Sequence, residues 1–490
     1  MNTSPLFSPD IPVQADFILI PYPEKAQKKL IRFLENYSVK YPNNWSEAAK
    51  VLVENHQPAF KKCIEHWNGK QKLILMGLGA EEVYNKLSQV SRWAAHQVID
   101  RKAVQHLAMI LPDFLDNNEI SALSNGLQLS TLRLDYYKRD KTIQPLKVSF
   151  HPSRKAAGQA IQEGITLAEV QEKICHLVNL PPNEKNPEYI VQWAKQQFHH
   201  RTIQIKVLES EELIKLGLNA LYTVGKGSAT PPRLLILDYH PSPTGKKLKH
   251  IGLVGKGVTF DTGGISLKDP LNMHLMKSDM GGAAAVLGAV DLIEKLGLPV
   301  HITAVIPLAE NSIGPDAYRP GDVIRAYNGK SIEVIDTDAE GRLILADALS
   351  YLIKNFKPGY VIDLATLTGS CIQTLGNKAA GLFTSNPELA SSLLKAGNLT
   401  GERLWHLPLW QEYEDEMTSD IADIKNLATK PVAGAITAAK FLEVFTDSHP
   451  AWAHLDIAGV AMVDSDYSKM RSATAYGVQL IKTWIEDLIN

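Results

Sequence analysis

Short runs of apolar residues alternate with longer segments of helical periodicity from residue 187 to the C-terminus. Most of these runs contain almost no polar residue, as expected for strands that helices cover on both faces. The pattern therefore predicts an α/β domain with a mixed, mainly parallel sheet flanked by helices. The strand candidates are residues 202–208, 234–238, 251–254, 302–306, 360–364 and 452–457.

The first 150 residues show the same alternation on a smaller scale, with apolar runs at 17–20, 73–76 and 107–111. A chain of 490 residues also exceeds the size at which a single core usually keeps growing. Helical sequence beyond residue 153 stops at Pro181 and Pro182, because proline cannot continue a helix. We predict two α/β domains: a smaller N-terminal domain (1–152), a linker helix (153–182) and a larger C-terminal domain (183–490).

Charge and cysteine content argue against several classes of protein. Lys and Arg total 51 against 53 Asp and Glu, so the formal net charge of -2 provides no general attraction to nucleic acid or anionic membrane. Cys63, Cys175 and Cys371 form no C-x-x-C pair, which argues against a disulfide framework or a thiolate zinc site. Residues 1–16 lack the basic and apolar regions of a leader, and no apolar stretch is long enough for a membrane span. We expect a cytoplasmic protein.

Lys256, Asp261 and Lys268 lie in the segment that follows the predicted strand 251–254. Glycine on both sides of Lys256, and a glycine pair after Asp261, allow the backbone to bend tightly. The segment does not match the phosphate-binding loop G-x-x-x-x-G-K-[ST]. A glycine-flanked lysine is by itself equally compatible with a solvated turn.

Asp279 stands just before an Ala-rich helical pattern that continues to about residue 296. The helix dipole favours an acidic residue at this position, so helix capping and metal ligation are both open for Asp279. The glycines at 281 and 282, with the alanines that follow, predict that this helix packs closely on the sheet.

Asp336, Asp338 and Glu340 alternate along the segment 335–343, which reads IDTDAEGRL. Three carboxylates so close repel one another unless cations compensate, and divalent metal ions are the simplest compensation. The alternative is a solvated acidic turn. Oxygen ligands suit Mg²⁺, Mn²⁺ and, less exclusively, Zn²⁺. The sequence contains neither an H-E-x-x-H zinc helix nor a G-x-S-x-G nucleophile elbow.

Together, these three segments resemble the leucyl aminopeptidase (cytosol aminopeptidase) family, peptidase family M17. The resemblance rests on GKGVTFDTGG at 255–264, MKSDMGGA at 276–283 and DTDAEGRL at 336–343. Further matching segments are GS at 227–228, PPRL at 231–234, DLATLTG at 363–369, GAITAA at 434–439 and WAHLDIAG at 452–459. The family most often has Asn where this chain has Asp336, so the site gains a negative charge. We expect Asp336 to support the ligands rather than to bind metal itself.

The resemblance implies a metal-dependent aminopeptidase of broad, leucine-type specificity that uses water activated by two metal ions per subunit. It implies Lys256, Asp261, Asp279 and Glu340 as ligands of one ion, and Asp261, Asp338 and Glu340 as ligands of the other. Mn²⁺ or Zn²⁺ is expected, with Mg²⁺ as a further option. Four carboxylates carry about four negative charges, which two dications neutralise. Lys256 must be neutral to act as a ligand; the alternative is a protonated Lys256 paired with Asp261 or Glu340.

The resemblance implies Lys268 and Arg342 as catalytic residues. Lys268 would stabilise the oxyanion of the reaction, and the guanidinium of Arg342 would hold a bicarbonate ion, whose planar shape it matches. An ion pair of Arg342 with Asp336 or Glu340 is the alternative. Substrates would be peptides with a free N-terminus, because a free α-amine can ligate a metal.

The residues expected around the substrate side chain are Met276, Thr366, Leu367 and Gly369. Core packing is an equally open role for Met276, and His454 is interpreted as a hydrogen-bonded strand histidine. The family is typically hexameric, so we expect a homohexamer. Some members bind DNA as hexamers, which makes a DNA-binding regulatory protein the alternative function, although the balanced charge argues against it. A phosphate-ester hydrolase with the same metals is a third hypothesis.

Overall fold

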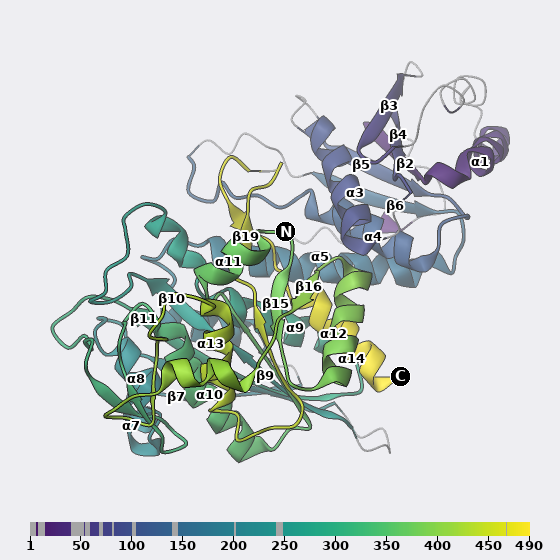
Figure 1. Ribbon diagram of the computed structural model, residues 1–490. Helices are drawn as coiled ribbons and strands as arrows, with labels where there is room; N and C mark the ends of the chain where they lie inside the picture. Colours follow the sequence, from purple (N-terminus) through teal and green to yellow (C-terminus); the bar gives the residue numbers. More distant parts are fainter. Residues whose placement is uncertain are drawn as a thin grey trace. The chain divides into compact units, whose positions relative to one another are not determined.

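The computed structural model describes residues 6–7, 15–40, 53, 59–67, 72–80, 83–99, 104–139, 146–199, 202–241, 248–466 and 468–490. Most of the segment 1–16, for which no leader is expected, lies outside these residues. The chain divides into two compact units (Figure 1). The first contains Met1–Glu172 and Asp466–Lys469, and the second contains Lys173–Ser465 and Met470–Asn490.

The N-terminal unit contains a six-stranded sheet of order β1-β6-β5-β2-β4-β3. All neighbouring strands are parallel except the edge strand β3, which is antiparallel to β4. The three apolar runs predicted as strands form β2, β4 and β5. The elements are β1 (Leu6–Phe7), β2 (Phe17–Tyr22), α1 (Gln27–Lys40), β3 (Lys62–Trp67), β4 (Lys72–Gly77), α3 (Tyr84–Ile99), β5 (His106–Leu111), α4 (Asn117–Leu129) and β6 (Lys147–Pro152).

Helix α5 (Ala157–Asn179) occupies most of the predicted linker. The division between the two compact units falls inside this helix, between Glu172 and Lys173. The domain bounds 1–152, 153–182 and 183–490 stay a prediction.

The C-terminal unit contains a nine-stranded mixed sheet of order β16-β15-β18-β14-β9-β11-β8-β7, with β10 paired to β11. The neighbours β18, β14, β9 and β11 are parallel, whereas β8 and β7 continue the sheet as antiparallel strands. The predicted α/β fold with a mainly parallel sheet is confirmed. The strands are β7 (Ile203–Leu208), β8 (Arg233–Tyr239), β9 (His250–Gly255), β10 (Gly257–Asp261), β11 (His301–Asn311), β14 (Tyr360–Ala365), β15 (Ala380–Phe383), β16 (Leu404–His406) and β18 (Trp452–Asp456).

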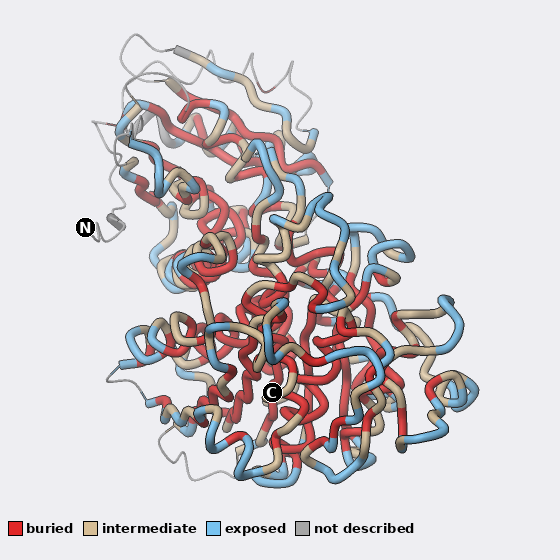
Figure 2. The backbone as a smooth tube through the Cα atoms, turned by 90° about the vertical axis from the view of Figure 1, so that its left-hand side faces the viewer, coloured by how far each residue is buried: buried red, intermediate tan, exposed pale blue. Residues whose placement is uncertain are grey.

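Helices cover both faces of this sheet. α9 packs against β9 and β14 with α14 and α12 beyond it, whereas α10 and α8 pack on the other face (Figure 1). The strands that these helices contact most, β9, β11 and β14, are largely buried, and Figure 2 shows buried residues, in red, concentrated in the interior. The helices are α6 (Pro187–Gln197), α7 (Ser210–Leu216), α8 (Asn219–Gly225), α9 (Gly281–Lys295), α10 (Glu340–Phe356), α11 (Gly369–Leu375), α12 (Pro387–Thr400), α13 (Gly434–Glu443) and α14 (Val478–Ile489).

Two small sheets complete the unit. One consists of β12 (Val323–Arg325), β13 (Ser331–Glu333) and β17 (Ile424–Lys425), and the other of β19 (Met462–Val463) and β20 (Ser472–Ala473). Among the described residues, no helix combines the length and apolar character needed to cross a bilayer.

The start of α9 lies very close to the sheet, as its glycine pair predicts. A Cβ atom on Gly282 would lie 2.0 Å from the carbonyl oxygen of Leu364 in β14. A Cβ atom on Gly255, at the end of β9, would lie 2.5 Å from the carbonyl oxygen of Gly282. Only residues without a side chain permit this approach, which brings the N-terminus of α9 against the carboxyl ends of β9 and β14.

Gly282→Ala should therefore destabilise the protein by about 1–3 kcal/mol, because the new methyl group overlaps the Leu364 carbonyl unless α9 moves away. The measurement is the urea midpoint of unfolding. Gly158→Ala in α5 is the matched control, because a Cβ there meets no atom within 4 Å. Equal midpoints for the two variants would contradict the close approach of α9.

Candidate active site

The structure brings the charged residues of the three motifs together beyond the carboxyl ends of β9, β10 and β14, where ligand sites of α/β sheets lie. Lys256 separates β9 from β10, Asp261 ends β10, Lys268 lies in the next loop, Asp279 precedes α9, Asp338 precedes α10, and Glu340 begins α10.

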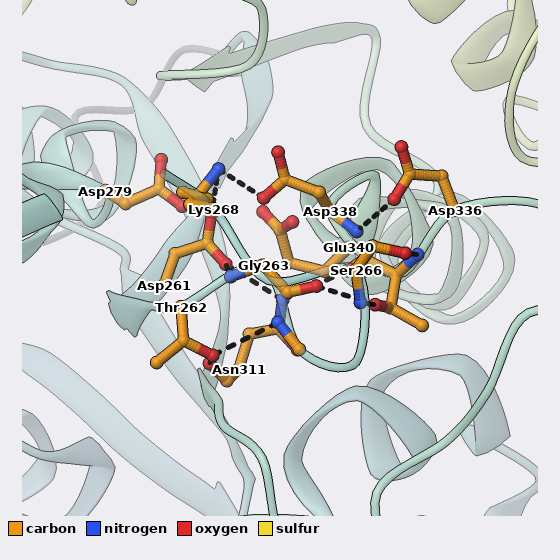
Figure 3. Close-up of polar contacts among 12 residues, drawn as sticks. Asp261, Thr262, Gly263, Ser266, Lys268, Asp279, Asn311, Asp336, Asp338 and Glu340 are labelled. Atoms are coloured by element: carbon orange, nitrogen blue, oxygen red, sulfur yellow. Dashed lines mark hydrogen bonds and ion pairs between the residues drawn. The ribbon is translucent and has the colours of Figure 1, made fainter. Parts of the chain in front are cut away.

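Three carboxylates lie at the centre of this cluster. Asp261, Asp338 and Glu340 each place an oxygen within 4.8 Å of the others, and Figure 3 shows them directed toward one another from two separate segments, Asp261 from one and the other two from the second. Burial, followed by repulsion from the other two carboxylates, raises the pKa of Asp338 to about 7. Burial and Asp261 raise the pKa of Glu340 as well. Oε2 of Glu340 is buried without a hydrogen-bond partner among the described residues. This environment favours a bound cation.

Lys256 is buried between two of the acidic residues. Its Nζ lies 2.8 Å from Oδ2 of Asp279 and 2.9 Å from Oε1 of Glu340, and it donates to the carbonyl oxygen of Thr366 at 3.0 Å. Burial alone would lower the pKa of Lys256, but Asp279, Glu340 and Asp261 raise it above its ordinary value. The protein's own carboxylates therefore favour the charged amine.

Lys268 bridges the other two acidic residues of the cluster, Asp261 and Asp338. Its Nζ lies 2.8 Å from Oδ2 of Asp261 and also pairs with Asp338 (Figure 3). Burial lowers the pKa of Lys268, but Asp261, Glu340 and Asp338 outweigh this effect and raise it. With 23% of its side chain exposed, this lysine is a charged group that solvent can reach.

Asp279 does not cap the helix that follows it. The N-cap of α9 is Met280, which makes no side-chain cap, and Oδ1 of Asp279 instead accepts a hydrogen bond from Oγ1 of Thr366 at 2.8 Å. The capping interpretation of Asp279 is therefore wrong. Its carboxylate contacts Lys256 in the cluster, and the short helix η2 (Met273–Ser278) ends directly before it.

Arg342 is buried on α10 and points toward a different partner from those predicted. Its Nη1 donates to the carbonyl oxygen of Asn426 at 2.9 Å, and Nε has no hydrogen-bond partner among the described residues. Within the described part of the chain, the guanidinium makes no ion pair with Asp336 or Glu340. Burial lowers the pKa of Arg342 to about 10, so the side chain is charged at neutral pH. Its Nε–H remains available as a hydrogen-bond donor.

Three residues that sequence reasoning missed hold the acidic segments. Asn311, at the end of β11, donates to Asp261, and Thr337 donates through Oγ1 to the carbonyl oxygen of Gly263 at 2.6 Å. Asn426 donates to the carbonyl oxygen of Asp336 at 2.7 Å. The position of Asn311 beyond the predicted strand 302–306 indicates a site residue, because site residues gather at the carboxyl ends of strands. No feature of the sequence indicates the contacts of Asn426.

The expected substrate-pocket residues lie on two neighbouring segments. Met276 is half-buried in η2, and its carbonyl oxygen accepts from the backbone N–H of Asp279. Thr366 touches the cluster directly through its contacts with Lys256 and Asp279. Leu367 donates its N–H to Asp456, and the exposed Gly369 begins α11.

His454 is a fully buried strand histidine, as its sequence position suggests. Its Nδ1 lies 2.5 Å from Oδ1 of Asp363, whose other oxygen accepts from the indole N–H of Trp452 at 2.8 Å. This pairing between β14 and β18 confirms the interpretation of His454 as a hydrogen-bonded strand residue.

Residues 173–482 match the model of the cytosol aminopeptidase family, catalytic domain. The chain belongs to this family. It is accordingly a metallo-aminopeptidase, a hydrolase that acts on peptides.

The curated relatives of this aminopeptidase cover most of its length. The probable cytosol aminopeptidase of Chlorobaculum tepidum is 41% identical over 441 residues, which are 84% of this chain and 86% of the relative. The probable cytosol aminopeptidase of Roseiflexus castenholzii is 39% identical over 474 residues, which are 91% of this chain and 92% of the relative.

Solved structures agree with the fold. The bottromycin maturation enzyme BotP in complex with Mn matches with a TM-score of 0.84 at 29% identity, over 97% of this chain and 100% of that one. The cytosol aminopeptidase from Coxiella burnetii matches with a TM-score of 0.80 at 28% identity, over 99% of each chain.

The side chain of Asp336 stabilises a backbone turn, and an asparagine side chain could stabilise it in the same way. Its Oδ1 accepts from the backbone N–H of Asp338 at 2.8 Å, and an amide oxygen can accept in the same way. Asp336→Asn should therefore leave the free energy of unfolding within about 0.5 kcal/mol, whereas Asp336→Ala should lower it by about 1 kcal/mol. Urea denaturation of the two variants checks this. A large loss for Asp336→Asn would show that the carboxylate charge itself is structural.

Proposed function

We propose that this aminopeptidase has broad, leucine-type specificity and works with two divalent metal ions per subunit. The observation that supports this most strongly is the approach of Asp261, Asp338 and Glu340 within 4.8 Å, with an unpartnered buried oxygen on Glu340. Carboxylate oxygens gathered at a buried, negatively charged position are the ligands that hard divalent cations prefer.

Lys256, Asp261, Asp279 and Glu340 would hold one ion, and Asp261, Asp338 and Glu340 the other. Lys256 already contacts two members of its set, Asp279 and Glu340. A dication at these carboxylates would oppose their effect on the pKa of Lys256 and favour the neutral amine that a ligand requires. Mn²⁺ or Zn²⁺ is proposed, with Mg²⁺ as a further option; the similar structure of BotP is in complex with Mn.

When bound, such a pair of ions lowers the pKa of a shared water molecule toward neutrality, so that it can attack the scissile carbonyl. Lys268 would remain protonated, because 23% of its side chain is exposed and solvent stabilises the charge on its ammonium group. Its partly exposed ammonium would stabilise the negative charge that develops on the carbonyl oxygen of the substrate.

Arg342 would hold a bicarbonate ion that accepts the proton of the attacking water. The guanidinium is charged, makes no ion pair within the described residues, and keeps an unpartnered Nε. A planar oxyanion fits the fork of donors that this side chain offers. The carbonyl oxygen of Asn426 would fix the orientation of the fork.

Substrates would be peptides with a free N-terminus, placed by their α-amine at the metal site. Thr366 touches Asp279 and Lys256, so the segment that begins there would border the first substrate residue. Met276, Leu367 and Gly369 would complete this pocket. The half-buried position of Met276 allows its thioether to contact a ligand.

Removal of metal with a chelator should abolish hydrolysis of leucine p-nitroanilide, and millimolar Mn²⁺ or Mg²⁺ should restore it. Glu340→Gln should lower kcat/KM by more than about 100-fold, because a proposed bridging carboxylate is lost. Glu402→Gln is the matched control, because Glu402 is equally buried but accepts a hydrogen bond from Leu480 away from the site. Chelator-resistant activity, full activity of Glu340→Gln, or turnover of p-nitrophenyl phosphate in preference to the anilide would sink the proposal.

The protein is proposed to be a cytoplasmic homohexamer, in keeping with its family and with the cytosol aminopeptidases it resembles. Trp405 and Trp410 of the C-terminal unit are 63% and 64% exposed. Large apolar side chains on a surface are suited to contact with another chain. Light scattering should give six chain masses in solution. A monomeric mass would contradict the proposed hexamer but would not bear on the proposed reaction.

A further inference from the structure

Asn311, the last residue of β11, is fully buried beside two of the acidic segments. Its Nδ2 donates to Oδ1 of Asp261 at 2.8 Å and to the carbonyl oxygen of Thr337 at 3.0 Å. Its own carbonyl oxygen accepts from the N–H and the hydroxyl of Thr262, at 3.0 and 2.9 Å. Figure 3 shows this residue among the contacts that join the segments.

The two acceptors determine how the amide is oriented. A carboxylate oxygen and a carbonyl oxygen both face the NH₂ group, and the opposite orientation would place three oxygens together. Oδ1 of Asn311 is buried without a hydrogen-bond partner among the described residues. The side chain therefore acts in this site as a donor of two hydrogen bonds.

At one end, the hydrogen bond from this amide makes the two oxygens of Asp261 different from each other. Oδ1 accepts from Asn311 and from the backbone N–H of Gly263 at 2.9 Å, so its acceptor positions are largely used. Oδ2, which lies beside Lys268, is the oxygen that remains for a further partner. The orientation of the carboxylate is thus set by its neighbours.

At the other end, the amide holds the backbone between Asp336 and Asp338. The carbonyl oxygen of Thr337 accepts from Asn311 and also from the hydroxyl of Tyr318 at 2.8 Å. One side chain therefore links the end of β10 to the segment that leads into α10, and carboxylates from both would share a metal ion.

We propose that Asn311 is a positioning residue for metal binding: its two N–H groups set the separation of Asp261 from the acidic segment 336–340. This inference rests on the proposed metal site. It requires no contact of Asn311 with the ion or the substrate. Ligands held in place by surrounding hydrogen bonds bind metal more tightly than ligands that must be ordered on binding.

Asn311→Leu tests this, because leucine has a similar shape and donates no hydrogen bond. Calorimetric titration of the metal-stripped full-length protein with Mn²⁺ should show a Kd raised about 10- to 100-fold. Asn125→Leu is the matched control: Asn125 is equally buried in the N-terminal unit, where its Nδ2 donates to Gln171 at 2.8 Å. This control should bind Mn²⁺ as the unaltered protein does.

The outcomes separate the two proposals. Absence of Mn²⁺ binding in the unaltered protein would remove the metal site itself, whereas unchanged binding in folded Asn311→Leu would overturn the role of Asn311 alone. Circular dichroism of the metal-free variants reports folding, and Asn311→Ala provides a smaller substitution if the leucine variant fails to fold. Failure of both to fold while Asn125→Leu folds would also overturn the proposal, because Asn311 would then be purely structural.

Discussion

The repulsion among closely spaced carboxylates is the interaction on which the site depends. Asp261, Asp338 and Glu340 lie within 4.8 Å of one another, and three charges so close repel strongly unless cations compensate, although 34% of the Asp338 side chain is exposed. Lys256 and Lys268 supply two positive charges, but an oxygen of Glu340 still lacks a partner among the described residues. The site is consequently assembled to receive more positive charge than its own side chains provide.

The fold places these carboxylates by bringing strand ends and helix starts to one edge of the sheet. β9, β10 and β14 deliver Lys256, Asp261 and the segment of Thr366, while α10 starts with Glu340. The close approach at Gly282 brings the segment before α9, and so Asp279, to the same edge. Hydrogen bonds from buried amides and hydroxyls then fix the loops between these elements, since loops alone would not hold charged groups in contact.

Much of the fold was predictable because buried strands have an unmistakable composition. The runs that form β9, β11 and β14 are mostly apolar, whereas β3, β15 and β16 are short or mixed and gave no clear signal. The charged site residues could be found because they cluster in three short motifs. The contacts of Asn426 could not be found, since the hydrogen bond from Arg342 to its carbonyl oxygen joins residues 84 positions apart. For Asn311, only its position beyond a predicted strand gave a signal. The role of Asp279 was open for a similar reason: its partners, Lys256 and Thr366, come from distant segments.

Anomalous diffraction from crystals grown with Mn²⁺ addresses the metal site most directly, because it locates each ion and its ligands together. Two peaks about 3.5–4 Å apart are expected, both in contact with Asp261 and Glu340, with Asp279 on one ion and Asp338 on the other. A single peak, or two ions that share neither Asp261 nor Glu340, would contradict the two-metal account.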